Sequence, residues 1–206
     1  MRRAVLITAA AIVALLVLSQ LLVPPYLEHR AEKRLTAHGG HATVSIDALP
    51  AARLLLHDGD EIKVRGEGLH VQLTNRRMNV FRELDRFNRA DVRLTRMSAG
   101  PFSVVRVAIA RSSSSRPYAF SLRASVTARD LSSYAGSQLA GGLGGFLGRL
   151  GSDVVPFSSE PIPVRIDAAI RSNGGQPELQ NVAGSVAGVP AGPLASAIAA
   201  AVADRL

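Results

Sequence analysis

The sequence predicts an α+β protein in which an N-terminal transmembrane helix precedes one domain with a long, curved, antiparallel sheet. An uncharged apolar run from Ala4 to Val23 predicts the helix. Several later segments alternate apolar and polar residues, as half-buried strands do. Strand and helix patterns do not alternate regularly, which argues against a parallel α/β fold.

The apolar run at residues 4–23 is long enough to cross a bilayer, since a helix rises about 1.5 Å per residue. Arg2 and Arg3 precede it, so residues 1–3 are expected in the cytoplasm and the rest of the chain outside it. A cleaved signal peptide is the alternative, but the run is longer than its usual apolar region and reaches Pro24 without a small-residue cleavage site. A buried core helix is disfavoured because the run lacks a polar face.

The domain that follows is expected at residues 41–206, outside the cytoplasm. The chain has no cysteine, so this domain must be held together by its own core and not by disulfides. Residues 24–40 predict a juxtamembrane helix, which begins where Pro24-Pro25 breaks the anchor and stops at Gly39-Gly40.

The first part of the domain predicts two strands, a turn and a helix. Residues 42–49 form the first strand, and residues 50–59 form a short helix or turn. Residues 61–74 alternate with a phase slip at Gly66 to Gly68, which is typical of a bulge in one long strand. Residues 76–90 carry apolar residues at helical spacing and predict a helix.

The second part of the domain adds strands and a terminal helix, for a total of six or seven strands. The expected elements are a short strand at 91–97, a hairpin of 103–111 and 117–128 around a polar serine-rich tip, strands at 162–172 and 178–189 joined by a glycine turn, and a helix at 192–206.

Between the hairpin and the later strands, Asp130 or Ser132 caps a helix that runs through the glycine-rich stretch 140–151. Its spacing matches neither a dinucleotide fingerprint nor a P-loop, so a phosphate cradle is disfavoured. Two interpretations stay open: a core helix packed on the sheet, or an apolar element that borders a lipid site or enters a bilayer. Its bulky apolar face consists of Leu139, Leu143, Phe146, Leu147 and Leu150.

The sequence carries no catalytic signature, and we expect no catalytic residue, no cofactor and no metal site. His38 and His41 bracket two glycines, and Asp58, Asp60 and Glu61 share one turn. Either group could contact a metal ion, but ordinary loop and turn composition explains both, since spacing indicates no third ligand.

A basic segment follows the long second strand. A solvated face is the usual meaning of such a segment, and attraction to an anionic surface is the functional alternative. Nucleic acid is not an expected partner, because the topology argues against it and no nucleic-acid motif is present. The residues predicted to contact anionic headgroups or the membrane surface are Arg76, Arg77, Arg82, Arg86 and Arg89.

Three segments in order, "VSIDALPAARLLLHDGDEIKVRGEGLHV" (44–71), "TARDLSSY" (127–134) and "VAGVPAG" (186–192), make the chain resemble the LmeA-like family of actinobacterial cell-envelope phospholipid-binding proteins. The resemblance covers the chain from Ala42 onward. It implies a tubular lipid-binding fold, with a curved sheet wrapped on helices and an apolar groove for acyl chains. It also implies binding of phospholipid, expected to be anionic, and support of envelope lipid or glycolipid assembly.

Three functions are therefore compared. A membrane-anchored lipid-binding module predicts an inward apolar surface larger than a core needs. An envelope scaffold that binds a protein partner and no lipid predicts a filled core, and an envelope enzyme requires a cleft around residues such as His57, Asp58 and Asp60. The lipid-binding module is the interpretation we favour, and its strand residues are expected to be Val105, Val107, Ile109, Phe120, Leu122 and Ile166.

Overall fold

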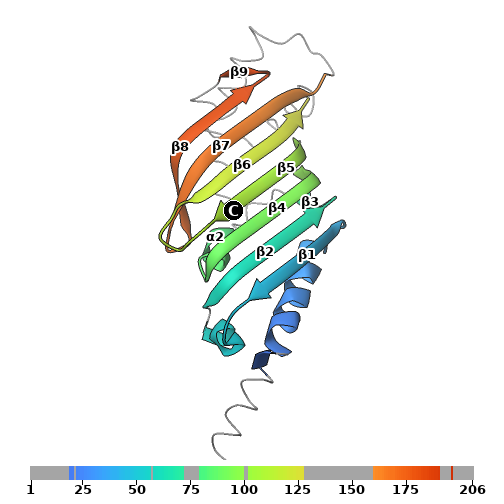
Figure 1. The fold of residues 1–206 in the computed structure, drawn as a ribbon. Helices are drawn as coiled ribbons and strands as arrows, with labels where there is room; N and C mark the ends of the chain where they lie inside the picture. The colour runs from blue at the N-terminus through green and yellow to red at the C-terminus, as the bar shows by residue number, and fades with distance from the viewer. Residues whose placement is uncertain are drawn as a thin grey trace, which may run out of the picture.

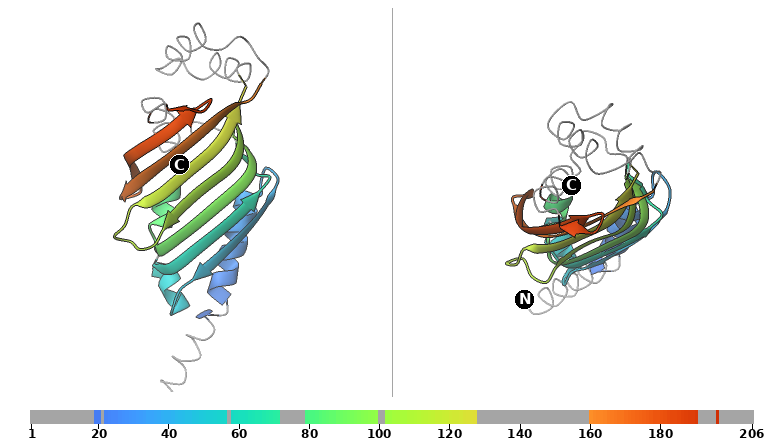
Figure 2. Two further views of the ribbon diagram at one scale, coloured as in Figure 1. Left: turned by 45° about the horizontal axis from the view of Figure 1, so that its top comes forward. Right: turned by 90° about the horizontal axis from the view of Figure 1, so that it is seen from above.

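The computed structural model describes residues 19–20, 22–56, 58–71, 79–99, 102–127, 160–190 and 196. These residues form one nine-stranded sheet in the order β1-β2-β4-β5-β6-β7-β8-β9, with β3 also paired to β4 (Figure 1). Seen from above, the sheet is curved and open (Figure 2). The elements are β1 (His41–Asp47), η1 (Ala51–Leu56), β2 (Gly59–Glu67), β3 (His70–Val71), α2 (Val80–Leu84), β4 (Phe87–Ala99), β5 (Phe102–Arg111), β6 (Tyr118–Val126), β7 (Ile162–Asn173), β8 (Gln176–Val186) and β9 (Val189–Pro190).

The expectation of a large curved sheet with few helices is confirmed, but the sheet is not purely antiparallel. β2 and β3 both run parallel to β4, in one continuous register from Gly59 opposite Phe87 to Val71 opposite Ala99. A parallel pair needs a crossover connection and not a tight turn. Here the connection contains α2. It carries the chain from the end of the sheet where β3 stops to the opposite end, where β4 begins.

The helix predicted over 76–90 is wrong in its second part. Helix α2 covers only Val80–Leu84, and β4 begins at Phe87 and continues through the predicted short strand to Ala99. Phe87 fits the helical spacing, but it is instead the first buried residue of the strand. Pairing with β2 on one side and β5 on the other supplies backbone hydrogen bonds that outweigh the local helical pattern.

The N-terminal helix covers the edge of the sheet. Residues 19–20 and 22–35 are helical, so Pro24-Pro25 does not break the helical run at the point we predicted. Val23, Leu27 and Ala31 pack on the core, and this burial offsets the backbone bonds that the prolines lose. Among the described residues, no helix is both long and apolar enough to cross a membrane. The greater part of the expected anchor lies outside them.

Two glutamates of this helix bind the free edge of β1. The backbone N–H of Ile46 donates to Glu28 at 2.7 Å, and that of Val44 donates to Glu32 at 2.9 Å. Further along, the Gln20 amide donates to the carbonyl of Ala48 at 3.0 Å. An uncovered edge strand is a template for aggregation. The helix therefore satisfies the edge and joins the N-terminal segment to the domain.

In three neighbouring strands, the alternation of inward and outward residues shifts by one residue at the same level of the sheet. Gly68 separates β2 from β3 with φ of 66°, and the opposite residue in β4, Arg96, has φ of 49°. Next to Arg96, β5 bulges between Val104 and Arg106, so that Val105 is unpaired with β6. The phase slip predicted at Gly66 to Gly68 is confirmed, although it divides the expected long strand into β2 and β3.

The bulge places like charges opposite one another on the outer face of the sheet. Because Val105 is an extra residue, Arg106 turns outward and lies opposite Arg123, which in turn lies opposite Arg165. We call these three exposed side chains the arginine row. Like charges directly opposite each other in a sheet are destabilising. Within the described part of the chain, no carboxylate forms an ion pair with any of them.

The remaining strand predictions agree closely with the structure. The hairpin of β5 and β6 has the expected polar tip at residues 112–117, and β7 and β8 meet at the expected glycine turn. The last predicted strand is interrupted, since Ala187 and Gly188 form a turn before β9. The helix through 140–151 and the C-terminal helix at 192–206, apart from Ser196, lie outside the described residues.

Candidate functional site

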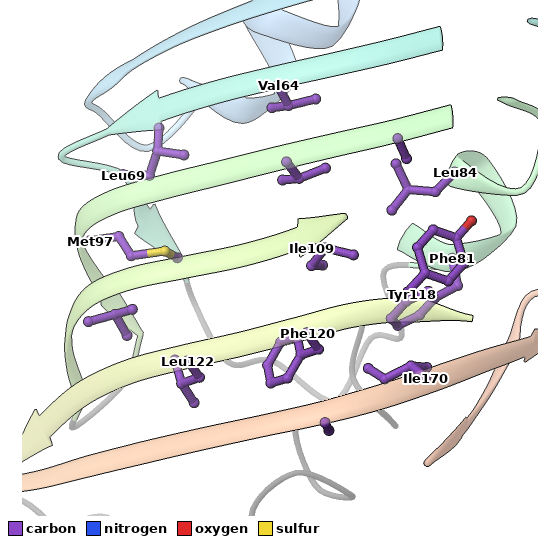
Figure 3. Packing of buried hydrophobic residues seen from close by; sticks show 14 of the residues in the cluster. Val64, Leu69, Phe81, Leu84, Met97, Ile109, Tyr118, Phe120, Leu122 and Ile170 are labelled. Carbon is purple, nitrogen blue, oxygen red and sulfur yellow. The ribbon is translucent and has the colours of Figure 1, made fainter. Parts of the chain in front are cut away.

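The inner face of the sheet is apolar from β1 to β7. Figure 3 shows buried side chains from β2, β4, β5, β6 and β7 projecting to one side, with α2 lying over one end. β6 buries every second residue from Tyr118 to Val126 without interruption, whereas the alternation in β4 and β5 contains the phase change described above. The opposite face carries most of the arginines and carboxylates of the strands. Burial of one face therefore decides the register of each strand.

Five of the six strand residues predicted to bind lipid lie together on this inner face. Val107, Leu122 and Ile166 are directly opposite one another on β5, β6 and β7, and Ile109 and Phe120 form the neighbouring row. The exposed fractions of four of them are 3% for Ile109, 4% for Phe120, 8% for Leu122 and 1% for Ile166, and Val107 is partly buried against the same cluster.

Val105 is the exception, and the prediction that it shares the inner face is wrong. Its exposed fraction is 59%, and it lies on the outer face beside Arg106. Simple alternation with Val107 and Ile109 would place it inward. The bulge on β5 shifts the phase by one residue, so Val104 takes the inward position instead, with an exposed fraction of 5%.

The predicted glycine-helix residues Leu139, Leu143, Phe146, Leu147 and Leu150 lie outside the described residues, as do Arg76 and Arg77. The other predicted arginines lie on α2, in the turn that follows it and at the start of β4. Arg82 is exposed on α2, Arg86 forms an ion pair of 2.7 Å with Glu83, and Arg89 lies 3.6 Å from Glu61.

A buried polar cluster closes the end of the inner face below α2. Arg111 donates from Nη1 to Asp85 at 3.0 Å, and from Nη2 to the carbonyls of Leu84, at 3.2 Å, and Phe87. Asp85 also accepts hydrogen bonds from the Tyr118 hydroxyl, at 2.9 Å, and from the Ser172 hydroxyl. Asp85 is thus the shared acceptor of Arg111, Tyr118 and Ser172, and it connects the end of α2 to β5, β6 and β7.

Aromatic rings complete this cluster. The Arg111 guanidinium lies 4.4 Å from the ring centroid of Tyr118, within the range of a cation–π contact. Tyr118 meets Phe81 of α2 edge-on at 5.3 Å between centroids, as Figure 3 shows. Burial, and secondly the hydrogen bond to Asp85, raise the pKa of the Tyr118 hydroxyl well above its usual value. The hydroxyl therefore stays protonated and donates to Asp85.

Two hollows lie at this end of the strands, and their charges differ. The larger, of about 650 Å³, lies beside the N-terminal helix and is lined by the carboxylates Glu28, Asp47, Asp60 and Glu61, and Arg89 is the one arginine among its described lining residues. The smaller, of about 230 Å³, contains no carboxylate among the described residues of its lining. We call it the arginine hollow; its lining consists of Arg111, Ser114, Ser115, Arg116, Pro117, Tyr118, Arg171 and Ser172.

Two of the candidate metal and enzyme residues, Asp58 and Asp60, have structural roles. Asp58 and Asp60 both pair with Arg53, at 2.8 and 3.0 Å. Asp60 also accepts the backbone N–H of Leu49 at 2.8 Å. In the described part of the chain no group of three or more histidines and carboxylates is placed to hold a metal ion. His57 lies outside that part.

Sequence reasoning missed Arg111, Asp85, Arg116 and Arg171. Arg111 was detectable, because it continues the inward phase of Ile109 on β5 and a charged residue at a buried position requires a partner. That partner could not be identified from the sequence, since Asp85 belongs to a segment that pattern reasoning assigned to a longer helix.

Comparisons with known proteins matched the chain to a protein family. A family model described as LmeA-like phospholipid-binding matches residues 19–206, which is nearly the whole chain. Searches of curated proteins and of solved structures each found no match.

Proposed function

Because this chain belongs to the LmeA-like phospholipid-binding family, we propose that it holds the acyl chains of a phospholipid against the inner face of its curved sheet. In this proposal residues 4–23 anchor the protein in a membrane with the domain outside the cytoplasm, where it supports assembly of envelope lipids or glycolipids. It acts as a binding protein and not as an enzyme, as the family description suggests.

One observation supports the apolar site more than any other. The inner face is continuous across β1, β2, β4, β5, β6 and β7, and its side chains are aliphatic or aromatic almost throughout. Acyl chains are held by apolar contact area and not by directional bonds, at roughly 25 cal/mol per Å² of buried apolar surface. A broad apolar face on a curved sheet is suited to such a ligand.

The strand β5 supplies a matched pair of variants that tests this proposal. Val105 and Val107 are identical residues two positions apart, and the bulge places them on opposite faces of the sheet. The full chain is purified in a mild detergent, and the bound phospholipid is extracted and quantified per mole of protein. We expect Val107→Asp to lose most of the lipid and Val105→Asp to retain it.

Circular dichroism is used to check that both variants keep the sheet, and Val107→Gln provides a milder substitution. Equal lipid content in folded Val107→Asp, Val107→Gln and wild-type protein would contradict the assignment of the inner face. A wild-type protein that neither retains lipid nor takes it up from added vesicles would favour the scaffold function, in which the apolar face is filled core.

A further inference from the structure

We propose that the arginine hollow binds the phosphate of the phospholipid headgroup. This inference rests on the proposed function and assigns the polar part of the same ligand. The hollow lies at the end of the apolar face, so that one molecule could place its chains on the strands and its phosphate between Arg116 and Arg171.

The charge of the hollow favours an anion. Arg111 is almost fully buried and shares the carboxylate of Asp85, whereas Arg116 and Arg171 are exposed. Within the described residues, neither Arg116 nor Arg171 has an ion-pair partner. Arg116 and Arg171 therefore both line a hollow whose described lining contains no carboxylate, and Glu178, which lies opposite Arg171 in β8, is not one of the lining residues. Guanidinium groups bind phosphate through paired hydrogen bonds, and this geometry makes arginine a preferred phosphate ligand.

A second observation concerns the donors of the hollow. Arg111 lines it with an exposed fraction of 7%, and its buried Nε–H has no acceptor among the described residues. Buried donors without partners are rare and require an explanation. A phosphate in the hollow would bring additional negative charge beside this guanidinium. The hydroxyls of Ser114 and Ser115, at the hairpin tip, are further donors in the lining.

Tyr118 lies at the boundary between the hollow and the apolar face. This residue lines the hollow, and its ring also packs on Phe81 in the core. The next inward residue of β6 is Phe120, so the polar and apolar regions are one strand repeat apart. A tyrosine at such a boundary presents an apolar ring and a polar end. The larger hollow is unsuitable for a phosphate, because four of its side chains are carboxylates.

The test measures headgroup preference separately from lipid retention. The full chain in detergent micelles is exposed to an equimolar mixture of phosphatidylglycerol and diacylglycerol with identical acyl chains, and the retained lipids are quantified. We expect wild-type protein to retain more phosphatidylglycerol than diacylglycerol. In the double variant Arg116→Gln, Arg171→Gln, the ratio of retained phosphatidylglycerol to diacylglycerol should fall about tenfold. Total lipid should remain unchanged, because the apolar face is intact.

The matched control is Arg65→Gln, Arg93→Gln, which removes the same charge from the outer face. Both of these arginines pair with Asp91 and neither lines the hollow, so the preference should be kept. Inorganic phosphate is the second probe, followed by the broadening of its ³¹P resonance. If the hollow binds phosphate, added inorganic phosphate should lower the phospholipid preference of wild-type protein. It should not change the preference of the Arg116/Arg171 variant.

Three results are decisive. An unchanged preference in the folded Arg116/Arg171 variant would overturn the phosphate assignment and leave the proposed function intact. Binding of inorganic phosphate that requires both arginines, without any headgroup preference, would make the hollow a site for free anions and would also overturn it. Absence of lipid from wild-type protein would instead refute the proposed function itself.

Discussion

Removing the shared carboxylate below α2 should destabilise the protein far more than removing a surface carboxylate with the same kind of partners. In the variant Asp85→Asn, the acceptor for Arg111, Tyr118 and Ser172 loses its charge and one of its two oxygens. The side chain of Arg111 is only 5% exposed, so its positive charge would remain buried with no anion beside it.

The magnitude follows from burial. Breaking a buried ion pair costs about 3–5 kcal/mol, and a hydrogen bond to a charged group contributes about 1.5–3 kcal/mol. Asp85 is 27% exposed, so water can partly replace it, and the lower end of the range applies. We therefore expect Asp85→Asn to lower the free energy of unfolding by about 3 kcal/mol.

Asp91→Asn is the matched control. Asp91 is 23% exposed and also accepts from two arginines, Arg65 at 2.9 Å and Arg93 at 3.0 Å. Those arginines are 47% and 58% exposed, and exposed pairs contribute only about 0–1 kcal/mol. The assay is urea unfolding of the full chain in a mild detergent, followed by far-ultraviolet circular dichroism. Equal losses in the two variants, or a loss below about 1 kcal/mol in Asp85→Asn, would refute the reasoning.

Two further predictions concern exposed charges. Arg123→Thr removes the central charge of the arginine row and should raise the free energy of unfolding by about 0.2–1 kcal/mol, a gain that salt should reduce; a loss in urea unfolding would contradict this. The N–H of Leu49, and secondly Arg53, hold the pKa of the Asp60 carboxyl below its ordinary value of about 3.9. The stability it adds is present above about pH 4 and is lost as the pH falls through the lowered pKa. Melting temperatures of wild-type and Asp60→Asn protein should therefore differ at neutral pH and converge in acid, and a constant difference would refute the assignment.

The strand pattern explains how much of the fold was predictable. In β7 the residues from Ile162 to Ile170 alternate without interruption, and the hairpin of β5 and β6 is marked by its serine-rich tip. These signals are local, because a half-buried strand has a period of two whatever its neighbours are. The phase slip at the glycines of β2 was local in the same sense, and it was placed correctly.

The corresponding shifts of the inward–outward alternation at Arg96 in β4 and Val105 in β5 were not predictable. Neither residue is a glycine, and each takes its position because adjacent strands must remain in register across the slip. The same slip determines which face Val105 occupies, so one predicted site residue was placed on the wrong side. The parallel pairing of β2 with β4 was likewise not predictable. Strands with the same residue pattern can be joined by a crossover or by a hairpin, so the pattern does not determine their relative direction.

The sequence by itself determined a strand-rich domain with one apolar face, an arginine-rich polar surface and a resemblance to a phospholipid-binding family. Periodicity, charge and motif order contain that information, because each is a property of residues close together in the chain. Only the tertiary structure decided that Asp85 accepts from Arg111, that Arg116 and Arg171 line one hollow, and that three arginines form a row. These contacts join residues on different strands, and their positions depend on register, on bulges and on a crossover that the backbone hydrogen bonds of the whole sheet select together.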